Sequence, residues 1–396
     1  MSRPHTILIA GAGIGGLTLA LALAAKGFRA MILEQAERLD DRGAGIQLSP
    51  NATRILIDLG LGPALAPLAF APEAIRVLVG QTESELVRVP LGDAAEAGYG
   101  VPYWVIHRGD LHGALLNAAQ ANGDIALRLG TRVEDFEVHS GGVTVLSWTR
   151  ARLAEERGIA LVGADGLWST VRTRLGDAEG PRFRQRTAWR TLVPAAAVSE
   201  EQRQPVTSLW LGPKAHLVHY PIRAGQWINV VAIVEDTWHQ AGWSLPGTRS
   251  EITSRFAGWA RGARALLATS PDAWSKWALY DREPLRAWSH GPVTLLGDAA
   301  HPMLPFLAQG GAMAVEDAAV LAGCLAKAPE DPPAALRAYE GLRRFRTARV
   351  VRHARRLGTI YHLAGPAAMV RNLTLIATGG QGLLARYDWL YDWRMS

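Results

Sequence analysis

Cysteine is nearly absent from this sequence of 396 residues, which contains only Cys324. A single cysteine excludes an internal disulfide and any metal site built from several thiolates. Long apolar runs are missing too, since no stretch reaches the roughly 18 residues of a membrane span. The first residues, Met-Ser-Arg-Pro-His, lack the apolar core of a signal peptide. We therefore expect a soluble, cytoplasmic protein with no metal site and no integral membrane segment.

Positive charge is present in excess but is not organised for nucleic acid. The formal net charge is +6, yet the arginines are spread along the chain and most alternate with acids, which argues against a nucleic-acid partner. One dense cluster comprises Arg343, Arg344, Arg346, Arg349, Arg352, Arg355 and Arg356. We interpret this cluster as the solvated face of a helix, with attraction of an anionic partner as the alternative.

The N-terminal segment contains a glycine-rich nucleotide-binding pattern. Residues 6–10 form an apolar run typical of a buried parallel strand. Helix formers fill 17–26, and a second apolar run at 29–33 ends at Glu34. Such a βαβ unit predicts a dinucleotide site, with Glu34 accepting hydrogen bonds from an adenosine ribose. The glycines between the first strand and the helix are Gly11, Gly13, Gly15 and Gly16.

These glycines have distinct expected tasks. Gly11 allows the tight turn, Gly13 lets the backbone approach a pyrophosphate, and Gly16 lets helix and strand pack closely. The helix N-terminus adds free N–H groups and a favourable dipole for the phosphates. An acid at position 34 disfavours a 2′-phosphate, so the pattern predicts FAD or NAD as the resident nucleotide.

Two more glycine-acid patterns follow, at 163–166 and 297–302, each after an apolar run. Between them, a strand-rich region is expected from about 187 to 234 and a polar helix from about 250 to 268. Several of the 14 tryptophans lie between 189 and 288, where they either pack in the core or build an apolar pocket. Helices are expected at 312–326 and 334–362, followed by a Gly-containing C-terminal tail.

Over essentially its whole length the chain resembles the single-component FAD-dependent aromatic hydroxylases, the class A flavoprotein monooxygenases that include salicylate hydroxylase, 3-hydroxybenzoate 6-hydroxylase and 6-hydroxynicotinate 3-monooxygenase. Beside the first glycine pattern, the resemblance rests on GAGIQLSPNATRIL at 43–56, HRGDLHGALL at 107–116, LVGADGLWSTVR at 161–172, WRTLVPA at 189–195, GDAAHPMLPFLAQGGAMAVEDAAVLA at 297–322 and LLARYDWLYDW at 383–393. These motifs are specific for the family and much less specific for the substrate.

The resemblance implies an oxidoreductase with bound FAD that hydroxylates a small phenolic or hydroxy-aromatic acid. NAD(P)H reduces the FAD, and O₂ then forms a flavin C4a-hydroperoxide that transfers oxygen to the ring. No second complete glycine fingerprint exists, so NAD(P)H is expected to bind transiently. The choice between NADH and NADPH, the position hydroxylated, any decarboxylation and the oligomeric state stay open, a homodimer being one option.

Cofactor contacts are also implied by the resemblance. Arg108 is expected at the FAD pyrophosphate, Asp165 to support FAD and pyridine-nucleotide use, and Asp298 at the ribityl chain. For both aspartates a turn or capping role is the alternative. Gln47 is expected to face the flavin.

A glycine-containing loop is expected beside the isoalloxazine. It contains Pro305, Gly310 and Gly311, and its N–H groups would meet the N1/O2 edge, where reduced flavin carries negative charge. Gln309 in this loop is a candidate to hydrogen-bond the substrate.

The segment 216–220 carries the candidate catalytic pair. His216 and Tyr220 lie on one face of a strand by its period of two, and their spacing matches a His and Tyr pair in the hydroxybenzoate and hydroxynicotinate members. His216 would accept the phenol proton and Tyr220 would orient the substrate. His219 falls on the opposite face and is the weaker candidate. A packed strand histidine is the alternative for His216.

The predicted architecture is α/β: a Rossmann-like FAD-binding domain with an interleaved β-sheet substrate domain and C-terminal helices. The FAD-binding domain comprises 1–72, 101–181 and 282–330, the substrate domain 73–100 and 182–281, and the helical region 331–396. An epoxidase or a polyketide or antibiotic hydroxylase of the same fold is the alternative function, and a non-catalytic FAD-binding regulator a remote one. A flavin halogenase is disfavoured because its Trp-x-Trp-x-Ile-Pro signature is missing.

Overall fold

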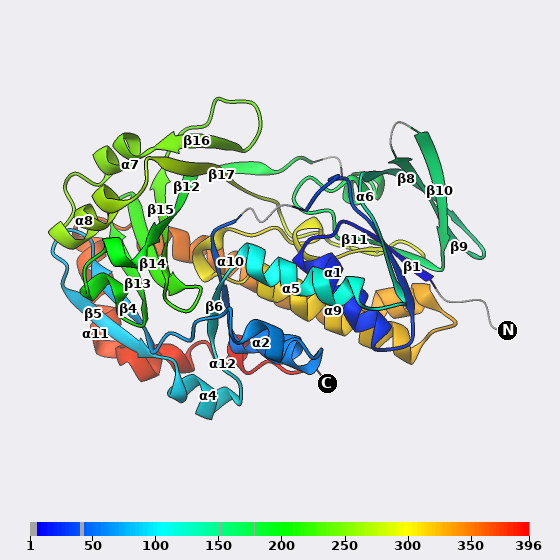
Figure 1. Cartoon of the computed structure of the whole chain (residues 1–396), viewed down its shortest axis with the longest axis horizontal. Coiled ribbons are helices and arrows are strands. Elements are labelled where there is room, and N and C mark those ends of the chain that lie inside the picture. Colours follow the sequence, from blue (N-terminus) through cyan, green and yellow to red (C-terminus); the bar gives the residue numbers. More distant parts are fainter. Residues whose placement is uncertain (1–5, 40–42, 150–151, 178, 396) are drawn as a thin grey trace.

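The computed structural model describes residues 6–39, 43–149, 152–177 and 179–395. Two large sheets dominate it, one parallel and one mixed, with helices around and between them (Figure 1). This mixed α/β architecture with C-terminal helices is the predicted fold class. None of the described helices is long and apolar enough to cross a membrane.

The first sheet has five strands, and every pairing in it is parallel. Its order is β18 (Val293–Leu295), β11 (Ala160–Gly163), β1 (Thr6–Ala10), β2 (Arg29–Leu33) and β7 (Ile125–Arg128). Ile7, Leu8 and Ile9 are fully buried, because both faces of the sheet are covered. That two-sided burial explains why β1 reads as a continuous apolar run rather than an alternating one.

Helices and a smaller sheet cover the parallel sheet. Helix α1 packs against α5 and α9, and the three lie side by side at the centre of Figure 1. The covering elements are α1 (Ile14–Ala24), α5 (Arg108–Gln120), α6 (Thr170–Arg174), α9 (Gly310–Lys327), β8 (Thr131–His139), β9 (Gly142–Thr149) and β10 (Arg152–Gly158). Strands β8 and β9 form an antiparallel hairpin, and β10 pairs with β9 as a third strand.

The second sheet has eight strands and is antiparallel except where β13 pairs with β4. Its order is β16 (Ser244–Thr248), β17 (Ala273–Asp281), β12 (Arg182–Pro194), β15 (Trp227–Glu235), β14 (Ala215–Ile222), β13 (Val206–Gly212), β4 (Ala74–Val79) and β5 (Glu85–Pro90). These strands come from 74–90 and 182–281, whereas the parallel sheet comes from the segments around them. Dividing the chain into domains at these points stays an interpretation.

One helix prediction was wrong in detail. The polar stretch expected as a single helix forms α7 (Arg249–Arg255) and α8 (Arg261–Thr269). The turn between them brings Trp259 onto Gly80 and Gly212, where any Cβ would overlap its ring. Packing of this indole against the sheet therefore overrides the helical propensity of the segment.

The C-terminal segment is helical throughout most of its length. Helix α10 (Pro332–Tyr361) is followed by α11 (Gly365–Ala385) and α12 (Asp388–Tyr391). The sequence predicted a helical region over 331–396 but no helix range after 362, and α11 occupies this Gly-containing tail and lies along β5. Gly379 kinks it at φ +66°, and a Cβ on Gly380 would overlap the carbonyl of Arg88. The glycines thus permit close approach to the sheet edge.

Short elements connect these layers. They are α2 (Pro50–Asp58), α3 (Gly62–Leu65), α4 (Asp93–Tyr99), and a two-stranded sheet of β3 (Gly45–Leu48) and β6 (Trp104–His107). A Cβ on Gly45 would lie 2.7 Å from the hydroxyl oxygen of Tyr220. Strand β3 therefore sits directly against the face of the eight-stranded sheet.

Candidate active site

A cavity of about 1260 Å³ separates the nucleotide-type loops from the eight-stranded sheet. One side is formed by the turns after β1, β2 and β11, and the other by β12, β16 and β17. The cavity-lining tryptophans Trp243, Trp274 and Trp277 come from the Trp-rich segment. This volume exceeds the roughly 300–1,000 Å³ of an ordinary single-ligand pocket.

The glycines after β1 shape one end of this cavity. Gly11 has φ +102°, and its N–H donates to the carbonyl of Leu33 at 2.8 Å. A Cβ on Gly16 would overlap the carbonyl of Gly11, and one on Gly15 would lie 2.6 Å from Leu296 Cδ2. Gly13 differs, because it lines the cavity and a Cβ on it would meet nothing within 4 Å. Three glycines thus serve packing, and Gly13 leaves space for a ligand.

Glu34 lines the same end of the cavity. Its carboxylate accepts hydrogen bonds from Ala12 N at 2.7 Å and Ala36 N at 2.8 Å. The acid is therefore held rigidly beside the glycine turn. That is where the sequence expects the ribose of the nucleotide.

Asp165 is both a helix-terminus acceptor and a cavity-lining residue. It accepts from Ser169 Oγ at 2.5 Å, Thr170 N at 2.8 Å and Val171 N at 3.1 Å. Burial raises the pKa of this carboxyl, and these hydrogen bonds oppose the rise. These local hydrogen bonds are those of a capping aspartate. Asp165 also lines the cavity, and its contact with the cofactor stays a prediction.

Asp298 and Arg108 face the cavity from different elements. Asp298 follows Gly297, which has φ +61°, and its side chain is exposed to the cavity. The desolvating surroundings of the cavity raise the pKa of Asp298 and Asp317 adds to the rise, whereas His301 and Arg108 oppose it. Arg108 begins α5 and is itself exposed. The two residues predicted to contact FAD are therefore close enough to interact electrostatically.

Helix α9 begins beside Asp298. A Cβ on Gly310 would lie 3.9 Å from Asp298 Oδ1, and one on Gly311 would lie 2.8 Å from Ile46 Cδ1. Pro305, shortly before this helix, lines the cavity. The N-terminal end of α9 thus lies near the cavity, as expected for a loop that meets the electron-rich edge of a flavin.

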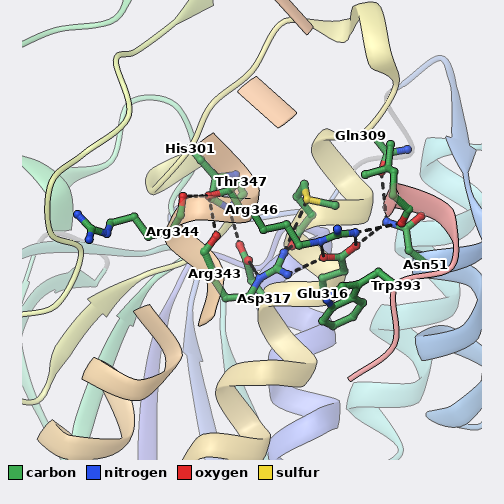
Figure 2. Close-up of polar contacts among 12 residues, drawn as sticks. Asn51, His301, Gln309, Glu316, Asp317, Arg343, Arg344, Arg346, Thr347 and Trp393 are labelled. Atoms are coloured by element: carbon green, nitrogen blue, oxygen red, sulfur yellow. Dashed lines mark hydrogen bonds and ion pairs between the residues drawn. The ribbon is translucent and has the colours of Figure 1, made fainter. Parts of the chain in front are cut away.

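A buried ion network supports the turn that carries Asp298 (Figure 2). Asp317 on α9 accepts from Gly297 N at 3.1 Å, His301 Nε2 at 2.5 Å and Arg343 Nε at 2.7 Å. Burial alone would raise the pKa of Asp317, but His301 and Arg343 outweigh burial and lower it to about 2. The turn is therefore fixed to both α9 and α10.

The neighbouring acid, Glu316, joins α10 to α2. It accepts from Arg343 Nη1 at 2.6 Å, Arg346 Nε at 2.7 Å and Asn51 Nδ2 at 2.6 Å. This network was not predicted from the sequence. The acid pair inside the apolar stretch GGAMAVEDAAVLA was a usable signal, since acids are rarely buried without a partner. The solvated-helix interpretation is wrong for Arg343, which is 1% exposed.

Gln309 caps this network. Its Nε2 donates to Ser49 Oγ at 2.8 Å, and its Oε1 accepts from Asn51 Nδ2 at 3.2 Å. Both ends of the amide are bonded within the protein. A direct substrate contact stays a prediction, and the geometry gives Gln309 a role in positioning the start of α9.

His216 and Tyr220 pack toward the 305–307 turn. Neither of them is among the described residues that line the cavity. His216 Nδ1 lies 2.8 Å from His362 Nε2, and its ring is 5.4 Å from that of Phe306. Burial lowers the pKa of His216 well below its usual range, and His362 and Arg186 add to this. These surroundings disfavour the protonated imidazole, so His216 is a weaker base here than a solvated histidine.

Tyr220 belongs to the same apolar cluster as Phe306. Burial raises its pKa, while Arg190 and Gln47 oppose the rise. Gln47 accepts from Tyr103 Oη at 2.6 Å, which places it between two tyrosines. A contact of Gln47 with the flavin stays a prediction.

His219 lies in a different environment. It accepts from Trp210 Nε1 at 3.2 Å, and burial lowers its pKa to about 3. Trp210 belongs to the cluster beneath α7 and α8. A packed strand histidine describes His219 well.

The described residues fit FAD. Gly13 leaves room for a pyrophosphate, Glu34 can accept from a ribose, and Asp298 presents its carboxylate to the cavity. The N-terminal ends of α1 and α9 add favourable dipoles for phosphate and for the flavin edge. Within the described chain no group of three or more His, Cys, Asp or Glu side chains is arranged to hold a metal ion.

Comparison with known proteins agrees with this geometry. Residues 5–354 match the family described as FAD binding domain. The chain is 39% identical to 3-hydroxybenzoate 6-hydroxylase 1 of Aquipseudomonas alcaligenes over 98% of this chain and 97% of that protein. It is 38% identical to 3-amino-4-hydroxybenzoate 2-monooxygenase of Streptomyces cremeus over 99% and 96%, respectively.

A solved structure is similar over the full length. A salicylate hydroxylase substrate complex superimposes with a TM-score of 0.84 and 26% identity, covering 100% of this chain and 97% of that one. The likeness therefore includes both sheets and the C-terminal helices.

Proposed function

The chain belongs to the FAD binding domain family and is an FAD-dependent monooxygenase that consumes NAD(P)H and hydroxylates an aromatic ring; from this premise we propose that its substrate is a hydroxylated aromatic acid. Support comes from the names of the three similar proteins, each of which acts on a benzoate that carries a ring hydroxyl. The position hydroxylated is not part of the proposal.

One observation carries the proposal: a single cavity joins the nucleotide-type loops to the part of the eight-stranded sheet that carries Arg190. FAD, when bound, supplies electron transfer from NAD(P)H and activation of O₂. The chain itself would hold FAD through Gly13, Glu34 and Asp298 and exclude water between the two sheets. Substrate would then occupy the part of the cavity beside β12.

In this proposal His216 is the base for the ring hydroxyl, which requires the bound substrate to reach the 305–307 turn against which His216 packs. Losing that proton makes the ring more nucleophilic, and a neutral imidazole can receive it. His362, bonded to His216, lies 3.8 Å from Glu235, whose side chain is 42% exposed. These three groups offer the proton a route from the buried strand toward solvent.

Replacing His216 tests this assignment. We expect His216→Ala to bind FAD and oxidise NAD(P)H normally, while hydroxylated product falls by about 10² to 10⁴, the usual range for a general base. Electrons would leave as hydrogen peroxide, measured beside the product. His219→Gln is the matched control, because the His219 ring packs on the opposite face of the strand. This variant should form as much hydroxylated product per NAD(P)H oxidised as the wild type. Equal hydroxylation by His216→Ala from pH 6 to 9 would refute the base role.

A substrate panel tests the function. Hydroxybenzoates, salicylate, hydroxynicotinates and matched neutral phenols are compared for stimulated NAD(P)H oxidation and for a product that gains one oxygen atom. We expect aromatic acids to stimulate both. Hydroxylation of neutral phenols or alkenes alone would contradict the acid class and favour a polyketide hydroxylase or an epoxidase.

We place the enzyme in the cytoplasm, where reduced pyridine nucleotides are available. A homodimer is the proposed assembly, and sedimentation of the purified protein distinguishes it from a monomer.

A further inference from the structure

Arg190 lies near the middle of the eight-stranded sheet and faces the cavity. Its strand, β12, is flanked by β15 and β17, and Arg190 pairs with Val231 on one side and Ser275 on the other. The adjacent Trp189 points to the opposite face, where it packs with the cluster beneath α7 and α8. By the strand period of two, Arg190 shares the face of Ala188 and Leu192. A guanidinium on a central strand is thus directed at a ligand space rather than at solvent.

This guanidinium has no partner among the described residues. Its Nε is buried without a hydrogen-bond acceptor, and burial lowers the pKa of Arg190. Other enclosed arginines are paired, as Arg343 is with Glu316 and Asp317. The Arg190 side chain as a whole is half-buried and lines the cavity, and a buried donor without an acceptor is costly. The missing acceptor is therefore expected to arrive with a ligand.

A second orphan donor lies on the same sheet face. Asn229 is fully buried, and its Oδ1 accepts from Gly45 N at 2.6 Å. That bond fixes the orientation of the amide, because only the oxygen can accept. The Nδ2 group is left without a partner. Asn229 and Arg190 are both donors, so the complementary ligand must present acceptors.

The sheet register brings these donors to Tyr220. Tyr220 pairs with Asn229, and Asn229 pairs with Leu192 in the next strand. The adjacent row runs from Val218 through Val231 to Arg190. Arg190 is also close enough to influence the ionisation of Tyr220. The unpaired cation therefore lines the cavity on the sheet face that also carries Asn229 and Tyr220.

We propose that Arg190 binds the carboxylate of the aromatic substrate and thereby selects aromatic acids over neutral phenols. A guanidinium matches a carboxylate with two parallel hydrogen bonds, which fixes the orientation of the ring as well as its charge. The inference rests on the proposed function, since it names the anchor for the acid group of that substrate. Arg190 also supplies a positive charge for an anionic ligand. The predicted pocket residues His216, Tyr220, Gln309 and Gln47 do not supply one.

The test measures binding of a hydroxybenzoate and of the corresponding hydroxybenzamide to the FAD-loaded enzyme, from the change in flavin absorbance. The wild-type enzyme should prefer the acid by at least about tenfold. Arg190→Met should weaken acid binding by about 10- to 100-fold and leave amide binding within about threefold, as loss of a charged hydrogen bond implies. Arg190→Lys keeps the positive charge but lacks the planar pair of donors. Its affinity for the acid should therefore lie between those of the wild type and Arg190→Met.

Arg132→Met is the matched control. Arg132 also lines the cavity, but it is 60% exposed and its Nη2 lies 2.5 Å from Glu134. Removing this charge should leave the acid-to-amide ratio of affinities within about threefold. A general field effect of cavity arginines would instead lower the ratio in both variants, which would overturn the specific role of Arg190.

Further outcomes distinguish a failure of the Arg190 assignment from a failure of the proposed function. Unchanged acid affinity in Arg190→Met, with the wild-type enzyme hydroxylating aromatic acids, overturns the anchor and leaves the proposed function intact. A loss of FAD affinity as large as the loss of acid affinity overturns it too, because Arg190 would then serve the cofactor. If the wild-type enzyme hydroxylates neutral phenols alone, the proposed function itself fails.

Discussion

At the scale of single residues, two neighbouring glycines should respond differently to the same added methyl group. In Gly13→Ala the Cβ enters open cavity space at an ordinary φ of −71°, so the protein should fold but bind FAD poorly. In Gly16→Ala the Cβ overlaps the carbonyl of Gly11, so stability should fall by about 1–3 kcal/mol. Bound-flavin absorbance and thermal unfolding of the apoproteins measure the two effects. Normal FAD occupancy in a folded Gly13→Ala protein would refute the pyrophosphate assignment.

Residues were predictable from sequence where their role depends on neighbours in the chain. The turn that Gly11, Gly13 and Gly16 build is local, and Glu34 follows from the same βαβ unit. Arg190 was not singled out, because its missing partner is apparent only when the strands are assembled. His362 was missed for the same reason, since it reaches His216 from 146 residues away.

At the scale of elements, the contact of α9 with α10 should make stability depend on acid pH. Asp317 has a pKa of about 2 in the folded protein, below the ~3.9 of an unfolded aspartate. Its stabilising contribution is therefore complete above about pH 4 and is lost as pH falls toward 2. Asp317→Asn should cost about 3–5 kcal/mol at pH 7, because Arg343 and His301 lose a buried partner.

Urea unfolding from pH 7 to pH 2 measures this dependence. The free-energy gap between the wild type and Asp317→Asn should narrow below about pH 4. Asp392→Asn is the control, since Asp392 is 51% exposed and pairs with Arg394 at the surface, where such a pair contributes about 0–1 kcal/mol. A gap that is constant with pH would show that Asp317 is not stabilised as an ion.

Elements were predictable where periodicity is strong and local. Strands β1 and β2 and helices α9 and α10 lie close to their predicted ranges. The C-terminal helical region was predicted, but the range of α11 was not, because its glycines suggest a tail. Their role depends on the edge strand β5, along which α11 lies. The break between α7 and α8 was missed likewise, since it depends on where Trp259 packs.

At the scale of the whole molecule, FAD should act as a structural link between the two sheets. The cavity is bounded by nucleotide-type loops on one side and by β12, β16 and β17 on the other, so bound FAD buries surface of both. Ligand that binds only the folded state adds RT ln(1 + [FAD]/Kd), which is about 2.7 kcal/mol at one hundred times Kd. For a chain of this size that corresponds to a few degrees in Tm. Tm should therefore rise continuously as FAD is added to the apoprotein, and Gly13→Ala should show the apoprotein Tm of the wild type but a weaker rise. A Tm that is independent of FAD concentration in the wild type would mean that FAD does not bind the folded enzyme in preference to the unfolded chain.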